Sequence, residues 1–144
     1  MKKINIIITF IVLALTVVSC ETYDDYNADR KTVVGFSVSS KNINNIPEGG
    51  ERSSTVDLFV SDIADVDREF KIMAIPALEA PATAPENYSF DATVLIPANT
   101  REGTITVTGI DNSIEDPEGE FFALAIEGGG NVVSGGRVSI RVRQ

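Results

Sequence analysis

The sequence predicts an all-β fold, a single seven-stranded antiparallel sandwich of two sheets. Seven segments combine β-branched residues with a period-two alternation of apolar and polar side chains. Turn residues separate these segments at short intervals, and no segment shows a convincing helical period. This arrangement is typical of an immunoglobulin-like sandwich, and a small barrel is the alternative.

Six of the seven predicted strands place a row of apolar residues on one face, which is expected to face the core. The rows are Val34, Phe36 and Val38 in Thr32 to Ser39; Val56, Leu58 and Val60 in Ser53 to Ser61; Ala92, Val94 and Ile96; Ile105 and Val107; Phe122, Leu124 and Ile126; and Val138, Ile140 and Val142. Glu69 to Ala77 is apolar on both faces, which predicts a central strand covered on both sides. Each buried Val, Leu, Ile or Phe contributes about 1.5 to 3 kcal/mol before entropy is subtracted, so these rows can stabilise a core.

Turn residues indicate how the predicted strands are connected. Pro97-Ala98-Asn99-Thr100 is a turn signal, and it predicts a hairpin between the strand ending at Ile96 and the strand that follows. Ala77 to Pro85 is a Pro- and Ala-rich loop, and loops at a sandwich end often recognise ligands. Asn131 to Ser134 lies between two runs of glycine and is predicted to be a mobile hairpin connection.

Composition excludes several chemistries. The chain has no histidine, so it cannot form a Ser-His-Asp or Cys-His arrangement, and it lacks the commonest zinc ligand. It has no tryptophan, which leaves Tyr88, Phe90 and Phe121 as the candidate aromatic surface for a sugar. Phe121 is expected to point outward because Phe122 points inward. The formal charge of −9 makes nucleic acid an unexpected partner.

The first twenty residues predict an export signal with a lipid anchor. Lys2 and Lys3 precede an apolar-to-neutral run from Ile4 to Val18, which is too short to span a bilayer comfortably. Val17-Val18-Ser19-Cys20 then resembles the lipobox of bacterial lipoproteins, in which the cysteine is acylated and becomes the new N-terminus. This resemblance implies lipidation of Cys20, the only cysteine, and several acyl chains would hold the protein firmly to a membrane.

The predicted organisation is a signal peptide at residues 1–19, a lipidated acidic tether at 20–31 and one β-sandwich domain at 32–144. Loss of the two lysines of the signal lowers the formal charge from −9 to −11. The acidic residues Glu21, Asp24 and Asp25 resemble the surface-export signal of Bacteroidota-type lipoproteins. The resemblance implies an outer-membrane protein exposed at the cell surface, and a solvated tether is the alternative interpretation.

Several landmarks follow one another in the second half of the chain. They are Asn87-Tyr88, the Pro97 to Thr100 turn, the Thr- and Val-rich segment Gly103 to Val107, Ile110-Asp111-Asn112 and the acidic segment Glu115 to Phe122. In this order they resemble a Calx-beta domain, and Pro47-Glu48-Gly49-Gly50 also resembles the opening of that family. The resemblance covers roughly Thr32 to Val142 and implies an immunoglobulin-like sandwich.

The same resemblance implies calcium binding by acidic residues at one end of the sandwich. The candidate ligands are Glu48, Asp111, Glu115, Asp116, Glu118 and Glu120. Calcium takes six to eight oxygen ligands, and carboxylates converging from neighbouring loops supply them. Asn87 and Asn112 stand where the family has aspartates, which lowers the charge of such a site. The alternative is that these acids keep a loop and a strand edge soluble.

The leading functional hypothesis is a non-enzymatic, surface-anchored lipoprotein that acts as a binding module, an accessory to an outer-membrane system for glycan uptake. Its expected partners are the membrane, outer-membrane transport proteins and extracellular glycan, and Tyr88 is the candidate ligand-binding residue. The alternative is a calcium-binding adhesion module. A minor alternative is a glycosidase using two carboxylates of the Asp111 to Glu120 loop.

Overall fold

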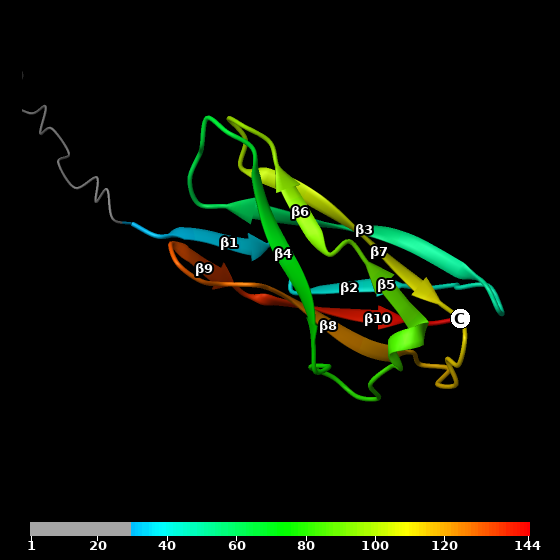
Figure 1. The fold of residues 1–144 in the computed structure, drawn as a ribbon. Coiled ribbons are helices and arrows are strands. Elements are labelled where there is room, and N and C mark those ends of the chain that lie inside the picture. Colours follow the sequence, from blue (N-terminus) through cyan, green and yellow to red (C-terminus); the bar gives the residue numbers. More distant parts are fainter. Residues whose placement is uncertain (1–29) are drawn as a thin grey trace, which may run out of the picture. The chain divides into compact units, whose positions relative to one another are not determined.

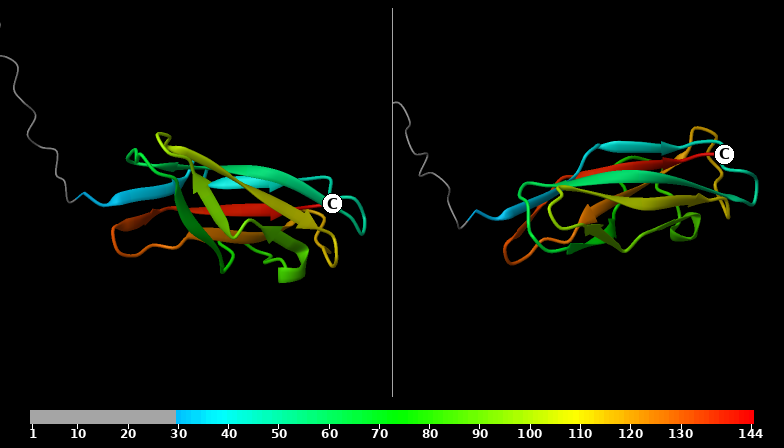
Figure 2. Two further views of the ribbon diagram at one scale, coloured as in Figure 1. Left: turned by 45° about the horizontal axis from the view of Figure 1, so that its top comes forward. Right: turned by 90° about the horizontal axis from the view of Figure 1, so that it is seen from above.

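The computed structural model describes residues 30–144, whose strands form two five-stranded sheets (Figures 1 and 2). One sheet has the order β5-β7-β3-β1-β9, and the other has the order β2-β10-β8-β4-β6. The strands are β1 (Thr32–Phe36), β2 (Ser40–Ile43), β3 (Glu51–Val60), β4 (Arg68–Ile75), β5 (Tyr88–Phe90), β6 (Thr93–Ile96), β7 (Glu102–Ile110), β8 (Glu120–Ile126), β9 (Val132–Gly135) and β10 (Arg137–Val142). The predicted all-β class is confirmed.

One hydrophobic core lies between the sheets, and it is built from the alternating rows that the sequence predicts. Leu58 and Ile105 come from one sheet and Leu124 and Ile140 from the other, and all four are fully buried. Period-two alternation explains the pattern, because successive side chains of a strand point to opposite faces. Within residues 30–144 the only helix is the 3-10 turn η1 (Pro85–Asn87), and no helix there could cross a membrane.

The predicted count of seven strands is wrong, because the structure has ten. The chain crosses between the sheets near both ends of the domain, so β1 and β2 belong to different sheets, as do β9 and β10. The second crossing occurs at Gly136, whose positive φ of 87° suits a glycine. One strand at each crossing was not predicted: β2 begins just after the predicted strand Thr32 to Ser39, and β9 occupies the segment Asn131 to Ser134, which was predicted as a hairpin connection. The short strand β5 was also missed.

The sheets are not wholly antiparallel. β1 pairs with β9 in parallel, and β2 pairs with β10 in parallel. These two pairs join the first strands of the domain to the last ones. The remaining pairs are antiparallel, as predicted.

The predicted hairpin across Pro97 to Thr100 is also wrong. β6 pairs with β4 and β7 pairs with β3, so the turn carries the chain from one sheet to the other. The crossing brings β6 close to Gly103, where a Cβ atom would lie 2.6 Å from the Cδ1 of Ile96. Glycine therefore permits a close approach that a larger residue would block.

Three predictions of burial fail. β4 is an interior strand of its sheet, but Met73 on its outer face is 39% exposed, and Ala74, on the same face as the buried Phe70 and Ile72, is exposed as well. Val38 is 45% exposed because it lies in the crossing between β1 and β2 and not in a strand. Ala92 precedes β6 and is likewise exposed.

Candidate functional site

The end of the sandwich predicted to bind calcium is organised around Asn87, which has 0% of its surface exposed. Its Nδ2 donates to Thr83 Oγ1 at 3.1 Å and to Glu120 Oε2 at 3.5 Å. Its Oδ1 accepts hydrogen bonds from the backbone N–H and the hydroxyl of Ser113, at 3.0 and 3.2 Å. Because all these partners lie on different segments, the buried amide ties the β4–β5 loop to the β7–β8 loop and the start of β8.

Two acidic residues extend this network. Glu120 is buried, and its Oε1 accepts the backbone N–H of Glu115 at 3.0 Å. Asp111 Oδ2 accepts the backbone N–H of Gly49 at 2.8 Å, which joins the β2–β3 loop to the end of β7. Hydrogen bonds from the Gln144 side chain and then from Gly49 hold the pKa of Asp111 below its ordinary value of 3.8. The ionised carboxylate therefore acts as a fixed acceptor between loops.

The other predicted calcium ligands are less enclosed. Glu48, Glu115 and Glu118 are exposed, and Asp116 is half-buried, with its Oδ1 accepting the backbone N–H of Glu118. Among residues 30–144 no three acidic, cysteine or histidine side chains are grouped closely enough to hold a metal ion. The buried acids Asp111 and Glu120 accept hydrogen bonds from backbone N–H groups. Calcium binding stays a prediction.

Tyr88 lies beside the core and not on an open platform. Its ring stacks on Phe122 with centroids 3.9 Å apart and planes 5° from parallel. It is half-buried and packs against the core cluster. One face of the ring is therefore occupied by Phe122, and its predicted role in ligand binding gains no support from this position.

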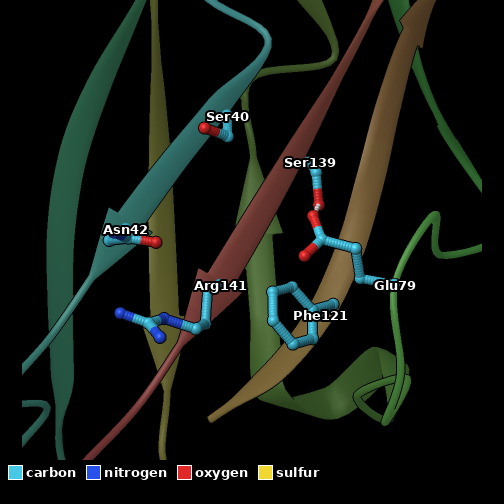
Figure 3. Close-up of a pocket in the computed structure, with 6 residues that line it drawn as sticks. All are labelled: Ser40, Asn42, Glu79, Phe121, Ser139 and Arg141. Carbon is cyan, nitrogen blue, oxygen red and sulfur yellow. Dashed lines mark hydrogen bonds between the residues drawn. The ribbon is translucent and has the colours of Figure 1, made fainter. Parts of the chain in front are cut away.

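A different site lies on the outer face of the sheet formed by β2, β10 and β8. This sheet-face hollow has a volume of about 190 Å³ and is lined by Ser40, Asn42, Glu79, Phe121, Ser139 and Arg141 (Figure 3). Strand register explains five of the six, because Ser139 pairs with Ser40, while Arg141 lies between Asn42 and Phe121. Residues paired in this way share one face of a sheet.

The sixth residue, Glu79, comes from the loop after β4. This loop is held against β8 by hydrogen bonds from Thr83 N to Phe121 O and from Phe121 N to Pro81 O, both 2.8 Å long. Glu79 Oε1 accepts the hydroxyl hydrogen of the buried Ser139 at 2.8 Å. The loop thus forms one wall of the hollow, and Ser139 fixes the position of its carboxylate (Figure 3).

Arg141 is the cationic member of the lining. Its Nε is buried without a hydrogen-bond partner, and its side chain forms no ion pair among residues 30–144. A Cβ atom on Gly119 would lie 2.9 Å from the Cγ of Arg141, so glycine leaves space for the arginine stem. In the view of Figure 3 the ring of Phe121 lies between Arg141 and Glu79.

A second hollow of about 270 Å³ lies beside the first and shares Asn42 with it. Its lining comes from β2, the following loop and β3, and consists of Asn42, Ile43, Asn44, Asn45, Arg52, Ser53 and Ser54. The Oδ1 of Asn44 is buried without a partner. Arg52 Nη1 donates to the backbone oxygens of Asn44 and Asn45, which shapes the loop.

Sequence reasoning found little of this surface. It identified Phe121 as an outward aromatic residue, and Phe121 lines the sheet-face hollow. The alternation within β10 could have shown that Ser139 shares a face with Arg141. Nothing local places Glu79 beside them, since 60 residues separate it from its partner Ser139.

Together the fold and these surfaces define a β-sandwich with two polar hollows. No protein-family model matches the sequence, and no curated protein is significantly similar to it. The fold does resemble solved structures. One is a two-domain protein with unknown function from Bacteroides fragilis NCTC 9343, with 13% identity and a TM-score of 0.62 over 81% of this chain and 46% of that one.

Two further solved structures bear on the predictions. A "putative carbohydrate binding protein" from Bacteroides ovatus ATCC 8483 has 8% identity and a TM-score of 0.62, over 77% of this chain and 36% of that chain. The apo-form Calx CBD1 domain has 11% identity and a TM-score of 0.57, over 79% of this chain and 99% of that domain. The resemblance to Calx-beta domains is confirmed at the level of the β-sandwich fold. The chain spans less than half the length of the two Bacteroides proteins.

Proposed function

We propose that this protein is a non-enzymatic binding module, anchored in the outer membrane through lipidated Cys20 and exposed at the cell surface, where it binds extracellular glycan for an uptake system. The observation that carries the proposal is the sheet-face hollow. Its lining combines a donor-only side chain, an acceptor-only side chain, hydroxyls, an amide and an aromatic ring. This mixture matches ligands rich in hydroxyl groups with an apolar ring face.

The lining favours binding over hydrolysis. A glycosidase generally needs two carboxyl groups flanking the scissile bond, about 5 to 9.5 Å apart. Glu79 is the single carboxylate of the sheet-face hollow, and it is hydrogen-bonded to Ser139. At the end of the sandwich predicted to bind calcium, called the loop end below, Asp111 and Glu120 accept hydrogen bonds from backbone N–H groups. These roles support a proposal of binding rather than hydrolysis.

The likeness in fold to a protein described as carbohydrate binding supports the proposal by analogy. The lipidated cysteine and the acidic residues after it supply the proposed location, and Cys20 lies outside the described residues. Proposed partners are the membrane, through the anchor, and outer-membrane transport proteins. The acidic charge of the chain disfavours nucleic acid as a partner.

Two measurements test the proposal. Full-length protein in detergent is screened against an array of bacterial, plant and host glycans, and saturable binding to at least one class is expected. Protein expressed in a Bacteroidota host is labelled with radioactive palmitate and digested with protease on intact cells. Label that is lost in Cys20→Ser and protein degraded on intact cells would support surface anchoring. An array without binding would refute the glycan role.

A further inference from the structure

We propose that the sheet-face hollow binds one neutral sugar ring of a glycan, with Arg141 and Glu79 contacting its hydroxyl groups and Phe121 contacting its apolar face. The proposal rests on the proposed glycan-binding function and adds a site and a ligand class to it. We further propose that the glycan continues across β2 into the second hollow.

The charges of the lining select for a neutral ligand. Arg141 has only donors and Glu79 has only acceptors. A sugar hydroxyl both donates and accepts, so a ring with several hydroxyls can satisfy the two side chains at once. A carboxylated sugar would place its charge in the small hollow that contains Glu79, and an aminated sugar would place its charge near Arg141. Each charged sugar would be attracted by one of the two side chains and repelled by the other, whereas a neutral ring meets no repulsion.

Arg141 is the charged residue of the hollow without a protein partner: its Nε is unpaired, and its side chain forms no ion pair among residues 30–144. Buried polar groups in proteins are nearly always hydrogen-bonded, and an unpaired one carries a desolvation cost. Ser139, on the same strand, is paired with Glu79, whereas the buried Nε of Arg141 has no partner. Hydroxyl groups beside the guanidinium would give its donors the partners that the described residues do not supply.

Phe121 adds the apolar contact that sugar recognition commonly uses. The residue is half-buried, and both its backbone N–H and its backbone C=O are hydrogen-bonded to the β4–β5 loop. Its ring lines the hollow between the two charged side chains (Figure 3). A rigid aromatic surface binds at low entropic cost because few rotamers are lost.

The size of the two hollows indicates a ligand longer than one ring. The sheet-face hollow, at about 190 Å³, is smaller than the roughly 300 to 1,000 Å³ typical of pockets for drug-sized molecules. It therefore suits a single ring. The second hollow meets it at Asn42 and is lined by further polar residues, among them Asn44 and Arg52. An oligosaccharide crossing the edge strand β2 would reach both surfaces.

The test uses full-length protein in detergent and a panel of named probes. The neutral probes are glucan, mannan and galactan oligosaccharides of one to six units, and the charged probes are oligogalacturonates and chitosan oligomers. Binding is measured by calorimetry for the wild type, Arg141→Met, Phe121→Leu and Glu79→Gln. Arg137→Met is the matched control, because Arg137 is exposed on the same strand and does not line the hollow. Melting temperatures verify that every variant folds.

The wild type is expected to bind a neutral oligosaccharide, and Arg141→Met and Phe121→Leu are each expected to weaken binding about tenfold or more. Arg137→Met should bind as the wild type does. Glu79→Gln should improve the relative affinity for oligogalacturonates. The affinity of the wild type should rise about tenfold from a monosaccharide to a trisaccharide, and Asn42→Ala should reduce that gain.

The unfavourable outcomes are distinguishable. If the wild type binds a neutral probe and the folded Arg141→Met and Phe121→Leu variants bind equally well, the hollow is not the site, while the proposed function stands. Preferred binding of a charged probe overturns the neutral ligand class. A monosaccharide bound as tightly as a trisaccharide overturns the role of the second hollow. Absence of binding to every probe, and to the wider array, overturns the proposed function as well.

Discussion

The loop end and the sheet-face hollow are both polar surfaces of one small sandwich, but they differ in how their polar groups are paired. At the loop end, Asn87 is bonded through both its Nδ2 and its Oδ1, and Glu120 accepts hydrogen bonds from two segments. On the sheet face, Ser139 holds Glu79, whereas Arg141 keeps unpaired donors.

The difference separates a structural role from a recognition role. Buried polar groups that satisfy one another fix the positions of loops, whereas a charged side chain without a protein partner can bind a ligand through its solvent-accessible atoms. By this criterion the acidic end stabilises the fold, although the sequence made it the leading candidate for a metal site. The sheet-face hollow, of which the sequence analysis singled out only Phe121, is the better candidate for binding.

The largest expected effect follows from removing the buried amide at the loop end. Asn87→Ala should lower the free energy of unfolding by about 2 to 3 kcal/mol, because Ser113 and Glu120 lose their buried partner. Urea denaturation measures the change. Asn112→Ala is the control, since Asn112 is exposed, and it should cost less than about 1 kcal/mol. Equal losses in the two variants would contradict the central role of Asn87.

Arg141→Met should have a smaller effect on stability and one of opposite sign. Methionine retains an apolar stem and removes the buried, unpaired Nε, so the variant should be unchanged or more stable by up to about 1 kcal/mol. Urea denaturation of the wild type and of Arg137→Met provides the reference. A loss of more than about 1 kcal/mol would mean that Arg141 stabilises the free protein and would weaken the contrast between the two surfaces.

Asp111 should make stability depend on pH in the acid range. Its pKa is lower in the folded chain than the ordinary 3.8, so its stabilising effect is complete above pH 3.8 and declines as the pH falls through the lowered pKa. The stability difference between the wild type and Asp111→Asn should therefore narrow as the pH falls below 3.8. Denaturation curves across the acid range measure it. A difference that is constant with pH would show that the ionised carboxylate has no special role.

Calcium should have the smallest effect. The acids at the loop end already accept N–H hydrogen bonds, so 1 mM calcium, about the upper end of the dissociation constants of weak extracellular sites, should leave the melting temperature unchanged. A rise that disappears in Asp111→Asn would instead establish the calcium site implied by the family resemblance. Magnesium at the same concentration is the control for ionic strength.

The sequence by itself determined the all-β class and most of the inward rows, because these depend on a local period of two. Val34, Val56, Ile105 and Ile140 could be assigned to the core from alternation alone. The prediction failed at Val38, where the chain leaves one sheet for the other. Alternation shows that a segment is a strand, but it does not show which sheet the strand joins.

Only the tertiary structure decided the strand order, the two parallel pairs and the composition of the sheet-face hollow. The hollow combines Ser40 and Asn42 with Glu79, Phe121 and β10, so its members come from strands and a loop far apart in the sequence. Such contacts depend on the register of pairing between distant strands, which the burial of the whole core sets and no local pattern encodes. Tertiary contacts also decided that Asp111 and Glu120, which are close in sequence, accept hydrogen bonds from different loops.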